Sequence, residues 1–360
     1  MATSTVPAAT GGASASASAW LGPLKVVAAI ALLIAAPYVL YPVFLAKVLC
    51  FALFASAFNL LLGFAGLLSF GHAAFFGFSA YVSAHAAKEW GLTPELAILS
   101  GTTVAALLGT GVGLLAIRRQ GIYFAMVTLA LAQMVFFLCV QAEFTRGEDG
   151  IQGVPRGDLF GLIDLDSNMA IYYFVLAIFV IGIAIIYRTV HSPFGQVLKS
   201  IRENEPRAIS LGYDADRYKL IAFVLSATLS GLAGATKVLV FQLASLTDVA
   251  WQMSGEVVLM TILGGVGTML GPIVGAAIIV TMQNYLAQIG SLTTIIQGFV
   301  FVFCVLLFRR GIVGEINHRW RQLRSRGREA PAALAPAGTA PRADGDAEAA
   351  HARQRTMTEG

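Results

Sequence analysis

Long apolar runs separated by shorter polar stretches dominate this chain. A helix that spans a bilayer needs about 20 apolar residues, and most of the runs are long enough. Pro37 and Pro42 separate the first run from the second. The pattern predicts an all-α polytopic membrane protein with about 8–10 transmembrane helices. The approximate limits of the apolar segments are Leu24–Leu40, Val43–Leu62, Leu67–Ala87, Glu95–Ile117, Ile122–Gln141, Ala170–Tyr187, Leu220–Phe241, Val257–Gln283 and Thr293–Phe308.

Two glycine-rich stretches interrupt these segments. They are LGFAGLLSFGHAAFFG at Leu62–Gly77 and LGGVGTMLGP at Leu263–Pro272. Inside a bilayer, irregular backbone is tolerated only where protein buries it or where it lines a water-filled cavity. We therefore expect Gly-broken or re-entrant helices at both places, and paired breaks in the two halves of a chain are typical of a transport pathway. Close helix packing also requires small residues, so a purely structural role for the glycines stays open.

Polar side chains near the breaks are candidates for the lining of such a pathway. His72 favours this interpretation, because an ionisable group at membrane depth usually faces the interior of the bundle. Each polar residue could equally form one interhelical hydrogen bond, worth about 1 kcal/mol. Helix N-termini at the breaks would offer unpaired N–H groups to a substrate carboxylate. The predicted lining consists of Asn59, Ser69, His72, Thr128, Gln133, Gly264, Gly265 and Thr268.

The polar interval 187–219 does not have the composition of a slack linker. Val197 and Ile201 recur in it at helical spacing. Asn204 can cap a short helix that Gly212 would end. Six Lys/Arg residues stand against four acidic residues in this interval. The interval is therefore either a cytoplasmic surface for a partner protein or a solvated connector that holds cytoplasmic positive charge.

Loop charges predict the orientation, because cytoplasmic loops carry an excess of Lys and Arg. Arg118 and Arg119 mark one inside turn, whereas the loop 142–169 has two basic residues against six acidic ones and should lie outside. The interval 187–219 is then inside. The segment after Phe308 is rich in arginine, so we expect both the N-terminus and the C-terminus in the cytoplasm.

This orientation creates a parity problem near the C-terminus. The segment Leu220–Phe241 carries the chain out, so the return to an inside tail needs an odd number of crossings. Two apolar segments remain, and one of them cannot be a simple span. Val257–Gln283 is the candidate because its glycine-rich interruption allows a re-entrant pair of half-helices or two short crossings.

Composition supports a membrane protein and argues against several other classes. The chain has 360 residues, of which 57% are hydrophobic and only 12% are charged, whereas soluble proteins carry about 25% charged residues. The net charge of +4 indicates orientation rather than nucleic-acid binding. Cys50, Cys139 and Cys304 lie in apolar runs without CxxC spacing, so we expect neither a disulfide nor a metal site.

No catalytic motif is visible. The chain lacks GxxxxGK[ST] and contains no HExxH motif or Ser/His/Asp arrangement, so we predict a transport subunit that binds no cofactor and is not itself an enzyme. Residues 1–19 are rich in Ala, Ser, Thr and Gly and are expected to be disordered. Residues 315–360 read as a basic and then Ala/Pro-rich disordered cytoplasmic tail.

Three stretches together resemble one known family. They are Asn59–Ala84 (NLLLGFAGLLSFGHAAFFGFSAYVSA), Gly195–Ala235 with its RENEPRAISLGYDADRYK core, and the interrupted Leu263–Gly275. The loop TRGEDGIQGVP at Thr145–Pro155 and the sequence FRRGIVG at Phe308–Gly314 add to the likeness. The chain resembles LivM-type permease subunits of bacterial branched-chain amino acid ABC importers, and the resemblance covers most of a permease domain at residues 20–314.

The resemblance implies an assembly in the inner membrane of the cell. A second, related permease, two cytoplasmic ATPases that hold ATP and Mg, and an external solute-binding protein would be the partners. Membrane lipid would surround the permeases, and no nucleic acid is implied. The external loop would include Arg146, Gly147, Asp149 and Gly150. The residues that fit the family's ATPase-coupling helix are Gly195, Ile201, Arg202, Glu203, Asn204, Ala208, Leu211 and Gly212.

Two features leave the identity of the transported solute open at this stage. Arg146 and Glu148 place opposite charges in a loop that is often more neutral in the family, which also includes permeases for urea, amides and aromatic acids. The alternatives are a passive channel or a secondary transporter for a small solute such as urea. A secondary transporter usually needs several buried ionisable groups, and the spans offer few beyond His72. Lys237 and Glu256 are expected to extend to the outer interface.

Overall fold

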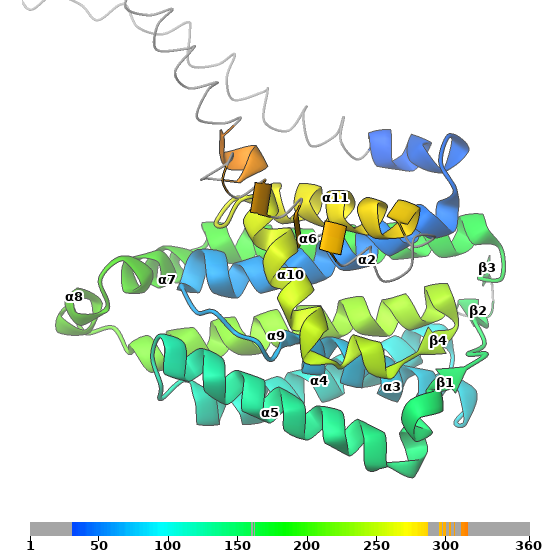
Figure 1. Ribbon diagram of the computed structural model, residues 1–360, viewed down its shortest axis with the longest axis horizontal. Coiled ribbons are helices and arrows are strands. Elements are labelled where there is room, and N and C mark those ends of the chain that lie inside the picture. Colours follow the sequence, from blue (N-terminus) through cyan, green and yellow to red (C-terminus); the bar gives the residue numbers. More distant parts are fainter. Residues whose placement is uncertain are drawn as a thin grey trace, which may run out of the picture. The chain divides into compact units, whose positions relative to one another are not determined.

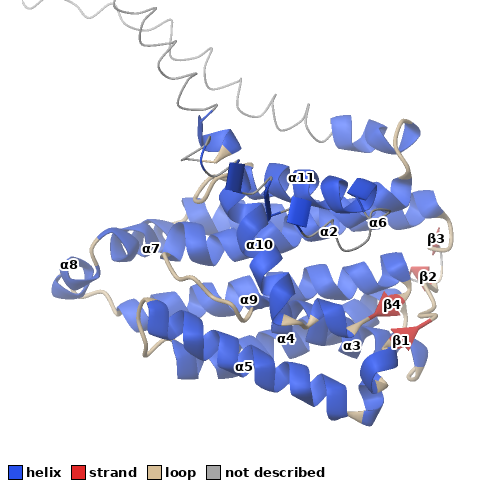
Figure 2. Ribbon diagram, in the orientation of Figure 1, coloured by secondary structure: helices blue, strands red, loops and turns tan. Residues whose placement is uncertain are grey.

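The computed structural model describes residues 31–159, 161, 163–286, 295–296, 298–299, 302–303, 306 and 311–315. Helices make up almost all of the regular structure in these residues (Figure 1, Figure 2). The predicted disordered segment 1–19, the predicted tail 315–360 apart from Glu315, and most of the predicted segment Thr293–Phe308 lie outside the described residues.

The helices follow one another with short connections. The helical elements are η1 (Ala36–Tyr38), α2 (Pro42–Asn59), the π-helical turn η2 (Leu60–Ala65), α3 (His72–Lys88), α4 (Pro94–Ala116), α5 (Ile122–Gln141), η3 (Glu143–Thr145), η4 (Gly147–Asp149), α6 (Asn168–His191), α7 (Pro193–Glu203), α8 (Glu205–Ser210), α9 (Ala215–Phe241), η5 (Leu246–Asp248), α10 (Trp251–Gly264) and α11 (Gly271–Leu286).

Five helical segments of the described chain are long and apolar enough to cross a bilayer. They are α2 continued by η2, then α4, α5, α6 and α9. The share of buried residues in the most apolar part of each segment differs. It is 89% in α2–η2 and 72% in α9, against 28–39% in the other three. The helices α2 and α9 therefore form the centre of the bundle, while α4, α5 and α6 leave much of their apolar surface for lipid.

Three shorter helices adjoin the glycine-rich breaks. The helix α3 has 17 residues, α10 has 14 and α11 has 16. No regular structure precedes α3 between Gly66 and Gly71, and none joins α10 to α11 between Gly265 and Leu270. The predicted interruptions at Leu62–Gly77 and Leu263–Pro272 are confirmed, and the second one separates two helices.

Short strands tie two loops together. The strand β1 (Ile151–Gln152) pairs antiparallel with β4 (Leu243–Ala244), with Ile151 opposite Ala244. The strands β2 (Asp158–Leu159) and β3 (Ile163–Asp164) form a second two-stranded sheet. Because β1 follows α5 and β4 follows α9, the loops 142–169 and 242–250 lie at the same end of the bundle. The helices α7 and α8 lie at the opposite end (Figure 1), as the charge pattern predicts.

Candidate transport pathway and coupling surface

The two glycine-rich breaks meet at Asn59, the last residue of α2. Its side-chain amide donates a hydrogen bond to the backbone oxygen of Thr268 at 2.9 Å and accepts one from the backbone N–H of Gly267 at 2.9 Å. Asn59 is only 2% exposed. One buried amide therefore joins the end of α2, just before the first break, to the α10–α11 connection that forms the second.

The helices α10 and α11 pack against each other as an antiparallel pair. A Cβ atom added at Gly264 would lie 1.8 Å from the backbone oxygen of Gly271, and one at Gly275 would lie 1.8 Å from that of Met260. No side chain fits at such distances, so these glycines allow backbone contact between the helices. The hydroxyl of Thr268 donates to the oxygen of Gly265 and accepts from the N–H of Gly271, which stabilises the turn.

His72 lies at the start of α3 and is fully buried. Its Nε2 is 2.9 Å from the hydroxyl of Ser226, which itself donates to the backbone oxygen of Ala57 at 2.6 Å. A hydroxyl has one proton, so the Ser226 oxygen accepts and His72 donates from Nε2. The rings of Phe58 and Phe223 pack edge-on against the imidazole. His72 faces the bundle interior, as expected, and joins α3 to α9.

Side chains satisfy the backbone N–H groups at the beginning of α3. The N–H of Ala73 donates to the hydroxyl of Ser254 on α10 at 2.9 Å. The N–H groups of Phe70 and Gly71 donate to the hydroxyls of Thr128 and Ser69, each at 3.2 Å. The predicted Thr128 and the unpredicted Ser254 therefore join the start of α3 to α5 and α10, whereas Ser69 bonds locally. In this conformation these three N–H groups are not available to a carboxylate.

The structure does not bring every predicted pathway residue into one group. Gln133 lies half-buried on α5 and makes no hydrogen bond within the described residues. Ser226 and Ser254 belong to the network around His72, although sequence reasoning did not select them. A small polar residue inside an apolar helix is a weak signal, because most such hydroxyls bond to their own helix, as Ser230 does here.

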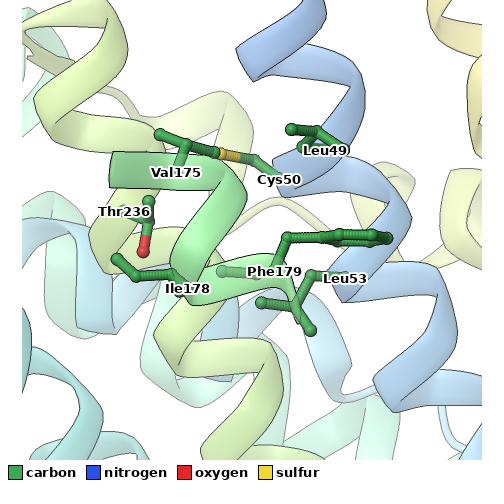
Figure 3. Close-up of a pocket in the computed structure, with 8 residues that line it drawn as sticks. Leu49, Cys50, Leu53, Val175, Ile178, Phe179 and Thr236 are labelled. Atoms are coloured by element: carbon green, nitrogen blue, oxygen red, sulfur yellow. The ribbon is translucent and has the colours of Figure 1, made fainter. Parts of the chain in front are cut away.

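A small gap between α2, α6 and α9 has no features of a binding site (Figure 3). Its lining is apolar except for Thr236, whose hydroxyl donates to the backbone oxygen of Leu232 at 2.7 Å. Cys50 and Phe179 are among the lining residues. The gap has no room for a water molecule and offers no free polar group, so we regard it as imperfect packing.

The interval 187–219 folds as its sequence predicts. The side chain of Asn204 caps α8 by accepting from the N–H of Arg207 at 3.1 Å. Gly212 follows the helix with φ of +90°, in the region that favours glycine. Gly195 lies in the first turn of α7, where a Cβ would be 2.3 Å from the backbone oxygen of Val190. These residues form two short helices that turn sharply at the end of α6.

The predicted coupling residues divide into a buried and an exposed set. Ile201 and Ala208 are each 2% exposed and pack with Ala215. Gly195 is buried as well, and the exposed predicted residues are Arg202, Glu203, Asn204, Leu211 and Gly212. Sequence reasoning did not select their exposed neighbours Ile209, Tyr213, Arg207 and Arg217. The apolar side chains Ile209, Leu211 and Tyr213 are 55%, 69% and 40% exposed. We call Ile209, Leu211 and Tyr213 the α8 patch. Adjacent exposed apolar side chains with charged neighbours are typical of a protein-binding surface.

Arg202 connects this surface to the glycine-rich breaks. Its Nη1 donates a hydrogen bond to the backbone oxygen of Gly63 in η2. A Cβ at Gly66 would lie 2.9 Å from its Cγ, and one at Gly267 would lie 3.5 Å from its Nη1. The ammonium of Lys199 lies 5.7 Å from the ring centroid of Phe64. The end of α7 is therefore in contact with the first break and within reach of the second.

The predicted external loop is ordered by its own contacts. Arg146 forms an ion pair with Glu89 at 2.9 Å, and both side chains are about half exposed, at 51% and 45%. Gly150 lies against the backbone of Ala244, next to the β1–β4 pairing. Gly147 and Gly150 have positive φ angles, and Asp149 is exposed. The charge of Arg146 is therefore paired with a carboxylate of the same protein.

The comparison with known families decides the classification. A family model described as "Branched-chain amino acid transport system / permease component" matches residues 40–305. The chain belongs to this permease family. The match includes both breaks and the interval with α7 and α8, so the sequence-based assignment is confirmed.

Individual members are distant relatives. The protein is 27% identical over 278 residues to the high-affinity branched-chain amino acid transport system permease proteins LivM of Salmonella typhimurium and Escherichia coli. Each alignment covers 71% of this chain and 65% of the relative, slightly less than two thirds of its length. The ribose import permease protein RbsC of Bacillus subtilis is 27% identical over 238 residues, which cover 61% of this chain and 70% of the relative. No solved structure matches this permease-family chain.

Proposed function

We propose that this permease-family chain is a membrane subunit of an ATP-driven importer in which α7 and α8 pass movement from cytoplasmic ATPases to the glycine-rich breaks. The observation that carries the proposal is the contact of Arg202 with Gly63. A solvated connector would not need to place a guanidinium on the backbone of a membrane-embedded turn. Because Asn59 joins that turn to the α10–α11 connection, a displacement of α7 would reach both breaks.

The mechanism is alternating access. ATP binding draws the ATPases together and displaces α8, and rigid helices carry the displacement to the breaks. Breaks at Gly66–Gly71 and Gly265–Leu270 concentrate bending in two places, because they lack helical hydrogen bonds. ATP and Mg belong to the partner ATPases in this proposal.

The partners would occupy opposite ends of the bundle. The α8 patch, with Arg207 and Arg217 beside it, would face the ATPases. A second permease would pack alongside in the inner membrane, and an external binding protein would approach the loop 142–169. Both termini would then be cytoplasmic, consistent with the positive charge of α7 and α8 and the acidic composition of the outer loop.

Names of relatives support the choice of substrate. Two of the relatives are called branched-chain amino acid permeases, and the alignment with the ribose permease covers less of this chain. We therefore infer a branched-chain amino acid, or a related small polar solute, as the substrate.

The test uses the assembled complex with its ATPases and binding protein in proteoliposomes. The variant Arg202→Gln should lower ATP-driven leucine uptake at least tenfold while ATP hydrolysis stays within twofold, because the contact with Gly63 is lost. Arg119→Gln is the matched control, since Arg119 is exposed in the turn between α4 and α5 and its side chain makes no hydrogen bond or ion pair within the described residues. Normal uptake by Arg202→Gln would contradict the proposal, and so would leucine flux through liposomes that contain this chain alone.

A further inference from the structure

Four ionisable side chains gather between α2, α9 and α10, in the half of the bundle that ends at β1 and β4. Lys237 forms an ion pair with Asp248. Lys47 on α2 lies within electrostatic range of Lys237, Asp248 and Glu256. Glu256 on α10 lies within electrostatic range of Lys47, Asp248 and Lys237. The cluster contains two ammonium groups and two carboxylates.

The pair formed by Lys237 and Asp248 is complete in itself. Its side chains are only 13% and 2% exposed, and the hydroxyl of Ser245 donates a long hydrogen bond of 3.5 Å to the second Asp248 oxygen. The ammonium of Lys237 also lies over the rings of Phe76 and Phe241, at 5.9 Å and 5.7 Å from their centroids. The sequence-based expectation that Lys237 extends to the interface is therefore wrong, because a buried carboxylate holds its charge.

Lys47 and Glu256 are left without an ion-pair partner among the described residues. They are close enough to interact electrostatically but do not touch each other. One oxygen of Glu256 accepts a hydrogen bond from Gln283 on α11 at 3.0 Å, and the Lys47 ammonium lies 5.8 Å from the centroid of Phe241. Unpaired charges in a membrane-embedded bundle are costly, and such residues usually mark a substrate path.

We propose that Lys47 and Glu256 bind the carboxylate and the ammonium group of a zwitterionic amino acid as it passes through the protein. The carboxylate of the amino acid would accept a hydrogen bond from the Lys47 ammonium, and its ammonium group would donate one to the Glu256 carboxylate. One zwitterion would thus pair with two side chains that form no ion pair with each other. Phe241, which is 37% exposed, offers an apolar surface for an aliphatic side chain next to the same ammonium group.

The charge balance favours a zwitterion over other solutes. With the pair of Lys237 and Asp248 neutral, one positive and one negative group remain, and a zwitterion compensates both at once. A sugar or urea offers no charge to either group. An anion or a cation alone would leave one charge buried without a partner. The inference rests on the proposed function and names the feature of the substrate that the membrane subunit recognises.

The experiment measures leucine uptake and ATP hydrolysis in parallel by the reconstituted complex, with saturating leucine-loaded binding protein. Lys47→Met and Glu256→Gln should each lower uptake about tenfold to a hundredfold, the usual effect of removing a charge-assisted hydrogen bond. ATP hydrolysis stimulated by the loaded binding protein should stay within twofold. Lys47→Arg is the matched control and should retain most uptake, because it keeps the positive charge.

Each outcome has one meaning. Uptake within twofold of the original in both Lys47→Met and Glu256→Gln would overturn the inference, and so would a parallel loss of uptake and ATP hydrolysis, which indicates a structural role. If Lys47→Met fails to assemble, Glu256→Gln keeps the question decidable because its amide has nearly the shape of the carboxylate. A complex without substitutions that takes up no amino acid would refute the proposed function itself, and the inference with it.

Discussion

Single residues join the parts of this protein that move in the proposed mechanism. Asn59 uses both ends of its amide to hold one peptide segment, with a donor to Thr268 and an acceptor for Gly267. Hydrophobic contact would hold the same helices together without fixing which residues face each other. A buried amide fixes this alignment, because any shift leaves polar groups unpaired.

Replacement of this amide should cost measurable stability. Asn59→Leu keeps a similar volume but leaves the N–H of Gly267 and the oxygen of Thr268 without their partner. We expect a loss of roughly 2 kcal/mol in the free energy of unfolding, visible as a lower midpoint in thermal unfolding of the purified protein. Thr103→Val is the control, because its exposed hydroxyl bonds only to Leu99 in the same helix. Equal midpoints for the two variants would argue against the bridging role.

Gly212 tests the helix end predicted from sequence. No atom lies within 4 Å of the position a Cβ would occupy, so only the backbone angle of +90° opposes a side chain. Gly212→Val should destabilise the folded backbone at the end of α8 by about 1–3 kcal/mol. It should also reduce ATP-driven uptake more than ATP hydrolysis. Gly212→Asn should be mild, since asparagine tolerates the left-handed region. Full uptake by the valine variant would show that the end of α8 has no part in coupling.

At the scale of elements, the helix pair α10–α11 depends on backbone contact. The glycines at 264 and 275 bring the two helices closer than any side chain allows. The consequence is a pair of short helices whose connection lies beside α7, next to Arg202.

Two glycines near α10 give a matched pair of variants for this packing. Gly275→Ala places a methyl group against the oxygen of Met260 and should destabilise the protein by roughly 3 kcal/mol. Gly255→Ala, on α10 with nothing within 4 Å, should be neutral or stabilising by up to about 1 kcal/mol. Thermal unfolding in detergent would measure both. Similar losses in the two variants would mean that the close contact does not exist.

At the scale of the whole molecule, the apolar pattern and loop charges were sufficient for most of the fold. The long helices, the breaks and the two structured ends follow from segment length, glycine spacing and Lys/Arg counts. The sequence could not place Arg202 on Gly63, or join Asn59 to Thr268, because these contacts connect residues more than a hundred positions apart. We also expected Lys237 to extend to the membrane interface, because the sequence does not show that Asp248, on a separate element, lies beside it.

The predicted pathway residues show the same limit. Asn59, Ser69, His72, Thr128 and Thr268 were selected for their polarity near the breaks, and the structure shows each in a hydrogen bond between or within segments. Polarity at membrane depth identifies residues that need a partner. Whether that partner is a substrate or a neighbouring helix depends on three-dimensional proximity, which periodicity does not encode.

Orientation can be tested directly on the whole protein. In a functional background without cysteine at positions 50, 139 and 304, we expect Ser210→Cys to react with a membrane-impermeant thiol reagent only in inside-out vesicles. Glu148→Cys should react only in right-side-out vesicles. Both positions are exposed, so neither result depends on local burial. Labelling of both cysteines from one side would reject the topology and the cytoplasmic location of α8.

The pairing of β1 with β4 has a mechanical consequence. Four residues, two on each strand, fasten the outer loop to the stretch that leads into α10. A protein that binds this loop and displaces it would exert force on these hydrogen bonds. The displacement would then reach Trp251, the first residue of α10, through residues 245–250. A movement of the loop would thus be transmitted to α10 through the connecting backbone rather than through the packed helices.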